Sequence, residues 1–282
     1  MSFRINNQAL AEPAYLCPLS LSIVLNSESN AGRLSVEHVP PASLGGKPFV
    51  LTSTKHNNQD GHSSDMNLLR YFEGQNFQAG KDEIPVKISS PQLDFTGMNA
   101  RFSFNAKEKV EVILSSSTKI INALDYKGLF KNWDGSKFSL QWTIQKELDK
   151  RAILKCAYLT AFRHLGYRML IDQKGFKNNT YGQLTAYLNG SETPFPTVII
   201  PGHAPLEQWP IGLVNQPSSL TNLFVNLTFS LKGFDYKYVV FLPHPSATSL
   251  DNLQQLHHQI EAKPDKIFDF SISELSPVLL FT

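Results

Sequence analysis

The 282-residue chain contains only two cysteines, Cys17 and Cys156, which lie far apart in the sequence. Small secreted domains that depend on disulfides carry several cysteines, so this scarcity argues against a disulfide framework and favours reduced thiols. No apolar run approaches the roughly 18 residues that a membrane-spanning helix requires. The N-terminal segment also lacks the basic start and apolar core of a secretory signal. The sequence therefore predicts a soluble, cytoplasmic protein with no membrane partner.

Internal repeats and low-complexity tracts are absent as well, which excludes repeat architectures. Hydrophobic residues make up 41% of the chain and charged residues 18%, a composition typical of globular rather than disordered proteins. A chain of this length can bury one large core or two modest ones. We expect two domains.

The formal net charge of +2 is unevenly distributed. Residues 106–180 contain 14 Lys and Arg against 7 Asp and Glu, a net charge of +7, whereas residues 1–105 and 181–282 carry −1 and −4. A basic segment of this kind suits the phosphates of a nucleic acid. A solvated surface helix would show the same charge, so both interpretations stay open on charge alone.

The first third of the chain predicts the order strand, loop, strand, helix. Residues 34–38 and 48–52 are expected to be strands, joined by a tight loop that contains two prolines and a Gly-Gly pair. A helix is expected to start near Asn57 and to end at Gly74. Residues 76–85 are polar and contain glycine, which makes them the best candidate for a linker.

The remainder predicts an α+β domain with antiparallel strands and one long helix, over residues 86–282. The expected strands are 86–89, 100–105, 110–114, 197–200, 223–231 and 236–242. The expected helices are 144–165, the strongest of all, and 250–262, before a β-like tail at 267–281. Cys156, on the long helix, is expected to lie in the protein core. Aromatic residues of the same region alternate with basic ones and can either stack on bases or form the core; they are Tyr158, Phe162 and Tyr167.

Acidic, imidazole and amide side chains gather around the Gly-Gly turn, within residues 34–65. They are Glu37 and His38 at the start of this stretch and Asn57, Asn58 and His62 at its end. Oxygen and nitrogen donors of these types hold divalent ions in proteins, and a histidine can activate water. The stretch therefore predicts a hydrolytic metal site.

The same stretch carries a family resemblance. The pattern LSVEHVPPASLGG at 34–46, followed by VLT at 50–52 and HNNxxGH at 56–62, resembles the HNH endonuclease family, in the subgroup with an EHxxPxxLGG start and a CNNxxG finish. The resemblance covers roughly residues 14–75. It implies that residues 1–75 form a ββα-metal nuclease unit. It also implies a metal-dependent endonuclease that hydrolyses phosphodiester bonds in nucleic acid, expected to be double-stranded DNA.

The resemblance assigns a role to each matching residue. It implies that His38 is the general base and that Glu37, Asn57 and His62 hold a divalent ion, with Mg²⁺ expected ahead of Mn²⁺ or Zn²⁺. In this family the position of Asn57 either coordinates the ion or fixes the loop geometry. Asn58, four residues before His62, competes with Asn57 for the role of ligand.

The resemblance also suggests a biological setting, bacterial antiphage defence, and a possible homodimer or partner protein. A second class of function stays open beside the nuclease. The chain can be a catalytically inactive module that keeps the same scaffold and binds nucleic acid or protein.

One departure from the family pattern concerns a structural zinc. Relatives with the CNN finish usually hold two CxxC knuckles, and the four corresponding positions here are Cys17, Ser20, Ser53 and His56. Serine is not a normal zinc ligand, and two remaining donors do not complete a tetrahedral site. We therefore predict that this zinc is absent and that apolar packing holds the region together.

Overall fold

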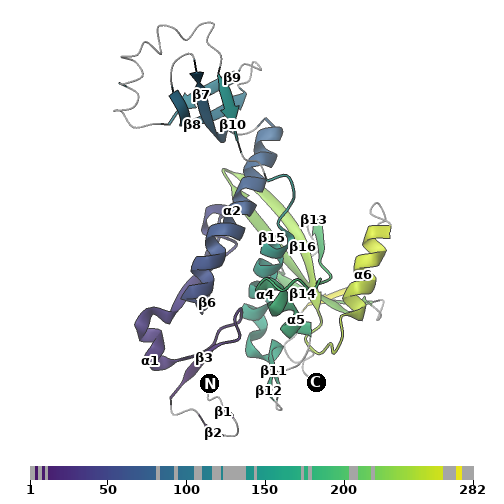
Figure 1. Cartoon of the computed structure of the whole chain (residues 1–282). Coiled ribbons are helices and arrows are strands. Elements are labelled where there is room, and N and C mark those ends of the chain that lie inside the picture. Colours follow the sequence, from purple (N-terminus) through teal and green to yellow (C-terminus); the bar gives the residue numbers. More distant parts are fainter. Residues whose placement is uncertain are drawn as a thin grey trace. The chain divides into compact units, whose positions relative to one another are not determined.

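The computed structural model shows a mixed α+β protein whose sheets are antiparallel, which confirms the predicted fold class at this level (Figure 1). It describes residues 4–5, 8–9, 12–80, 83–91, 95–104, 110–115, 122, 138–142, 145–172, 175–176, 180–202, 209–216, 220–262 and 271–274. The chain forms two compact units. Unit 1 comprises Met1–Met66 and Asp149–Thr282, and unit 2 comprises Asn67–Leu148. Within the described parts of the chain, no helix combines the length and apolar character needed to cross a membrane.

The bounds of these units differ from those expected from the sequence. The segment expected as one domain, residues 86–282, contributes to both units, because residues 149–282 form one compact body with the first 66 residues. The expected linker, residues 76–85, begins inside helix α2 (Thr54–Gln78) and ends inside strand β7 (Ile84–Ser90). Its polar composition suits an exposed helix end as well as a linker, and composition alone does not separate the two.

The N-terminal part of unit 1 consists of short hairpins followed by the predicted strand, loop, strand and helix. Its elements are β1 (Arg4–Ile5), β2 (Gln8–Ala9), β3 (Ala14–Leu16), β4 (Ile23–Leu25), α1 (Asn26–Glu28), β5 (Leu34–Val39), β6 (Lys47–Ser53) and α2. Strands β5 and β6 pair antiparallel, and α2 follows β6 directly. The order expected for residues 34–74 is therefore present.

Helix α2 is longer at both ends than the sequence predicts. It starts at Thr54, and Gly74 lies inside it instead of ending it. A glycine within a helix costs about 1 kcal/mol relative to alanine. Leu68 and Phe72 are fully buried on this part of the helix, and burial of one large apolar side chain contributes roughly 1.5–3 kcal/mol. The apolar face therefore outweighs the glycine.

The C-terminal part of unit 1 is a five-stranded sheet with helices packed on it. Its elements are α4 (Lys150–Leu165), β11 (Ile171–Asp172), β12 (Gly175–Phe176), α5 (Thr180–Leu188), β13 (Val198–Pro201), β14 (Ile211–Gln216), β15 (Asn222–Leu231), β16 (Phe234–Pro243), α6 (Asp251–Ala262) and β17 (Ser271–Glu274). The strand order is β13-β16-β15-β14-β17. Helix α4 packs against β14, β15 and β16, and α6 packs against β13 and β16 (Figure 1). The sequence did not predict α5 or β14.

Helix α4 begins later than expected, at Lys150. The side chain of Asp149 accepts a hydrogen bond from the backbone N–H of Ala152 at 3.0 Å, so it caps the helix at this point. Most of the helix is buried, including Tyr158 and Phe162. Of the two alternatives for these aromatic rings, base stacking or the core, the structure shows the core for Tyr158 and Phe162, because both are buried.

Unit 2 contains a four-stranded antiparallel sheet in the order β10-β7-β8-β9. Besides β7, its strands are β8 (Phe95–Phe104), β9 (Val110–Leu114) and β10 (Ser139–Gln141). Alternate residues of β7 and β8 form its core, namely Ile84, Val86, Ile88, Met98, Ala100 and Phe102. The predicted strands 86–89, 100–105 and 110–114 correspond to β7, β8 and β9.

Candidate functional site

The β5–β6 hairpin carries Glu37 and His38 at an irregularity in its pairing. Glu37 lies opposite Val50 and His38 lies opposite Pro48, so Phe49 is an extra residue on β6. Such a bulge increases the local twist and changes the directions of nearby side chains. On α4, the Arg163 guanidinium lies 4.4 Å from the centre of the Phe49 ring and holds the extra residue in place.

The loop between the two strands depends on glycine. A Cβ atom on Gly46 would lie 1.5 Å from the carbonyl oxygen of Pro40, closer than any real contact. The Gly46 N–H also donates to the carbonyl of Pro41 at 3.1 Å, and Gly45 has a positive φ of 82°. The LGG part of the motif therefore has a steric reason in this chain.

Asn57 ties the first turns of α2 to β5. Its Nδ2 donates to Ser35 Oγ at 2.9 Å and to the carbonyl of Val36 at 3.1 Å. Both acceptors lie just before Glu37 and His38 on the same strand. Of the two roles that the resemblance implies for Asn57, these contacts are those of a residue that fixes the geometry of the hairpin.

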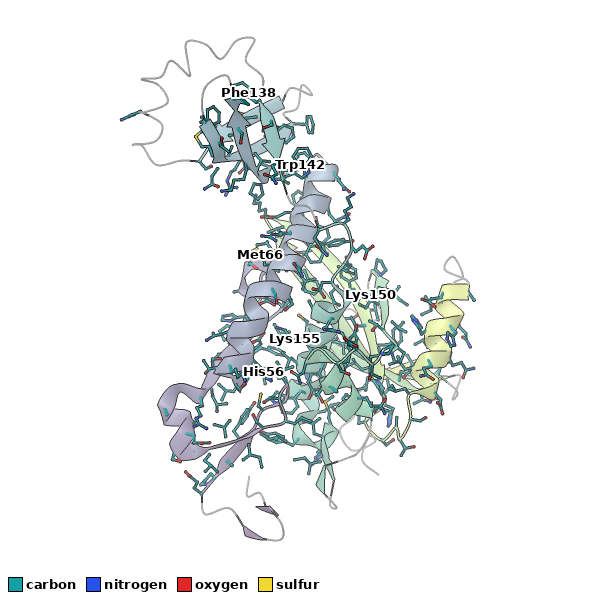
Figure 2. The ribbon with its side chains drawn as sticks, viewed as in Figure 1. His56, Met66, Phe138, Trp142, Lys150 and Lys155 are labelled. Atoms are coloured by element: carbon teal, nitrogen blue, oxygen red, sulfur yellow. The ribbon has the colours of Figure 1, made fainter. Side chains whose placement is uncertain are left out.

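Glu37 is buried and forms an ion pair with a residue far along the chain. Only 2% of Glu37 is exposed, and its Oε1 lies 3.0 Å from Nζ of Lys155, which is itself 5% exposed. The same Nζ lies 3.6 Å from Oδ1 of Asp65. Strand β5, helix α2 and helix α4 thus each contribute one charge to a cluster, whose lysine is labelled in Figure 2.

The charges of this cluster fix the protonation of its lysine. Burial acts to lower the pKa of Lys155, but attraction to Glu37 and Asp65 outweighs it and raises the pKa above its ordinary value. The ammonium therefore stays charged. Together the two carboxylates and the ammonium carry a net charge of −1.

The second carboxylate oxygen of Glu37 has no hydrogen-bond partner among the residues that the structure describes, although it is buried. Leaving a buried polar atom unsatisfied costs about 1–3 kcal/mol, and more when the group is charged. A bound cation would satisfy this atom. A carboxylate oxygen is also an ordinary ligand of Mg²⁺ and Mn²⁺.

The other predicted site residues are placed to different extents. His38 is half-buried next to Glu37, and Asn58 is exposed. His62 lies within α2, but its side chain falls outside the described residues. In the described part of the chain, no group of three or more His, Cys, Asp or Glu side chains is arranged to hold a metal ion. Of the four residues expected to form the site, the structure thus shows the buried Glu37 and the tethered Asn57 on adjoining elements.

Hydrogen bonds link three of the four zinc-knuckle positions, Cys17, Ser53 and His56. The turn after β3 is closed by hydrogen bonds between Cys17 and its neighbours Leu21 and Ser22. The Sγ of Cys17 accepts a hydrogen bond from the backbone N–H of Ser53 at 3.2 Å. Ser53 Oγ in turn accepts from the N–H of His56 at 3.3 Å (Figure 2 labels His56). The two segments that carry the four positions therefore face each other.

Polar side chains from the second half of unit 1 hold this turn. The Tyr158 hydroxyl donates to the carbonyl of Pro18 at 2.7 Å, and Asn189 Nδ2 donates to the carbonyl of Leu19 at 2.7 Å. The N–H of Leu16 donates to the Tyr167 hydroxyl at 3.2 Å. Cys17 and Leu19 are buried beside them. Packing and hydrogen bonds thus hold the region, and their partners come from α4 and the segments after it.

Sequence reasoning missed Lys155 as a member of the site. The sequence contains one signal for it, since this lysine is the only charged residue between Ile153 and Phe162 in the core of an apolar helix. A buried lysine requires an opposite charge nearby. The identity of the partner is not available from local sequence.

Comparison of the chain with protein-family models, with curated proteins and with solved structures gave no match.

Proposed function

We propose that this protein is a metal-dependent endonuclease of the HNH type, which hydrolyses phosphodiester bonds in nucleic acid. The observation that carries the proposal is the second carboxylate oxygen of Glu37, which is buried and lacks a hydrogen-bond partner among the described residues. It lies on the strand of a strand-loop-strand-helix segment, beside a histidine. This arrangement agrees with the EH motif and its expected chemistry.

His38 acts as the general base in this proposal. It follows Glu37 directly and is half-buried. His38 takes the proton from the water that attacks the phosphorus atom.

The divalent ion would be held by Glu37, Asn57 and His62. Glu37 supplies its second oxygen, while Asn57 keeps the start of α2 against β5 through Ser35 and Val36. When bound, the ion would neutralise charge on the phosphate and stabilise the leaving oxyanion. Mg²⁺ is the expected ion, because the proposed donors are mainly oxygen atoms.

The proposal extends to double-stranded DNA as the substrate. Lys47 and Lys55 are exposed, one at the start of β6 and the other in the first turn of α2. Exposed lysines on these two elements suit contacts with phosphates. The two buried free cysteines favour a reducing compartment such as the cytoplasm. A role in antiphage defence and assembly as a homodimer belong to the same proposal through the resemblance.

A plasmid-nicking assay tests the function directly. The wild-type protein and a His38→Ala variant are incubated with supercoiled DNA and Mg²⁺, Mn²⁺ or Zn²⁺. We expect the wild type to nick or linearise the plasmid with at least one ion and the variant to lose about 100-fold or more in rate. A His244→Ala variant is the matched control, because His244 lies on a different part of unit 1 and bonds to Ser246. Equal cleavage by the wild type and by His38→Ala would remove His38 as the base.

A second candidate is a nucleic-acid-binding module without turnover. The observation in its favour is the ion pair of Glu37 Oε1 with Lys155, which already supplies a cation to the carboxylate. In that case the same assay gives no nicking with any ion. A mobility-shift measurement on the same DNA would then show binding.

A further inference from the structure

We infer that Lys155 is a positioning residue that sets the charge of the ion site and thereby weakens its affinity for divalent cations. The inference rests on the proposed function, because it concerns the same carboxylate, Glu37. Lys155 belongs to α4, which the motif does not include.

The Lys155 ammonium lies between two carboxylates. Nζ of Lys155 lies 3.0 Å from Glu37 and 3.6 Å from Asp65, so a single ammonium bridges two carboxylates from different elements. Lys155 thus supplies a positive charge to both carboxylates inside the fold.

The contact with Lys155 also fixes the orientation of the Glu37 carboxylate. One oxygen bonds to Lys155, and the other is buried without a hydrogen-bond partner among the described residues. With one oxygen held, the carboxylate offers a single defined donor to an ion rather than a free pair. Lys155 therefore positions Glu37.

Lys155 also changes the charge of the ion site. Lys155 contributes one positive charge next to both carboxylates, and Lys155→Met removes it. A unit charge a few ångströms away changes the attraction of a cation strongly in a site that excludes water. The structure therefore predicts that Lys155 keeps the ion weakly bound.

Isothermal titration with Mn²⁺ as the probe tests this inference without measuring cleavage. Four proteins are compared: the wild type, Lys155→Met, Asp65→Asn and the double variant of both. Methionine keeps most of the length of lysine and removes the charge. We expect Lys155→Met to bind Mn²⁺ at least about tenfold more tightly than the wild type and Asp65→Asn to bind it at least about tenfold more weakly.

The double variant is the charge-matched control. Its cluster keeps Glu37 alone, with the same charge of −1 as the wild type, and we expect its affinity to lie within about threefold of the wild-type value. If Lys155→Met is unfolded without an ion, the comparison of the double variant with Asp65→Asn decides the question, since these two proteins differ only at Lys155. An unchanged or weaker affinity in a folded Lys155→Met would overturn the inference, and so would an affinity of the double variant that is no tighter than that of Asp65→Asn.

A Glu37→Gln variant separates this inference from the proposed function. If Mn²⁺ binding disappears in Glu37→Gln but has the same affinity in the wild type and in Lys155→Met, the inference is contradicted and the proposed metal site is retained. Absence of Mn²⁺ binding in all proteins refutes both. If the affinities follow the expected order but no DNA is cleaved, the inference is supported and the proposed nuclease activity is refuted.

Discussion

The carboxylate of Glu37 and the ammonium of Lys155 lie 3.0 Å apart in the interior of unit 1, although 118 positions separate them in the sequence. Both are almost completely buried. Breaking a buried pair by removing one partner leaves an uncompensated charge, which costs about 3–5 kcal/mol. This contact joins the motif-bearing hairpin to α4.

The first prediction concerns the stability of this pair. In the absence of divalent ions, Lys155→Met should lower the free energy of unfolding by about 3–5 kcal/mol, because Glu37 would remain buried without its counter-charge. The double variant Glu37→Gln, Lys155→Met should be more stable than Lys155→Met alone. Urea denaturation of the wild type, Glu37→Gln, Lys155→Met and the double variant gives the coupling energy between Glu37 and Lys155. A coupling energy near zero would show that the pair does not stabilise the fold.

The second prediction distinguishes the two roles of Asn57. Asn57→Asp keeps the size of the side chain and offers a stronger metal ligand, but it places a carboxylate oxygen against the carbonyl of Val36. If the amide fixes the hairpin, Asn57→Asp and Asn57→Ala should each lose about 1–2 kcal/mol of stability. Asn58→Ala, at an exposed position, is the control and should change little. Full stability of Asn57→Asp, with tighter binding of Mn²⁺, would instead make Asn57 a ligand.

The third prediction concerns the zinc-knuckle positions. Ser20→Cys combined with Ser53→Cys should create a zinc site with Cys17 and His56, because the backbone of Ser53 already contacts the Cys17 thiol at 3.2 Å. Four Cys and His donors complete the tetrahedral set of a structural zinc. Elemental analysis of the purified variant should find one zinc ion per chain. Adding Cys17→Ser should abolish uptake, and a cysteine variant that takes up no zinc would refute the correspondence with the knuckles.

The fourth prediction concerns the Gly-Gly turn. Gly46→Ala should lose about 1–3 kcal/mol of stability, because its methyl group would meet the carbonyl of Pro40 and force the loop to shift. Gly182→Ala is the matched control. It lies in helix α5, no described atom lies within 4 Å of the added Cβ, and it should gain about 1 kcal/mol. Thermal unfolding of both variants, followed by circular dichroism, measures the difference.

The fifth prediction concerns the two thiols. Cys17 and Cys156 are both buried and free, and burial raises the pKa of Cys156 to about 12. Burial keeps a disulfide reagent away from both thiols, so neither residue should react in the folded protein near pH 8. Both should react after unfolding in guanidinium chloride. Rapid labelling of one thiol in the native state would contradict the packing of α4 or of the β3–β4 turn.

Local sequence patterns were sufficient for the hairpin that carries Glu37 and His38 and for most strands. Alternation, the two prolines and the Gly-Gly pair predicted β5, the loop and β6 within one or two residues. The end of α2 was predicted wrongly, because Gly74 is a local signal and the burial of Phe72 is not. Likewise α4 starts where Asp149 caps it, six residues later than periodicity alone suggests.

The sequence by itself determined the chemistry that the site can offer, since the carboxylate, imidazole and amide of Glu37, His38 and Asn57 are covalent properties of the chain. It also determined the turn that holds them, because only glycine fits at position 46. Tertiary structure alone decided that Glu37 is buried and that Lys155 is its partner. The reason is physical: burial and ion pairing depend on contacts between segments 118 positions apart, and no local pattern encodes which segments meet.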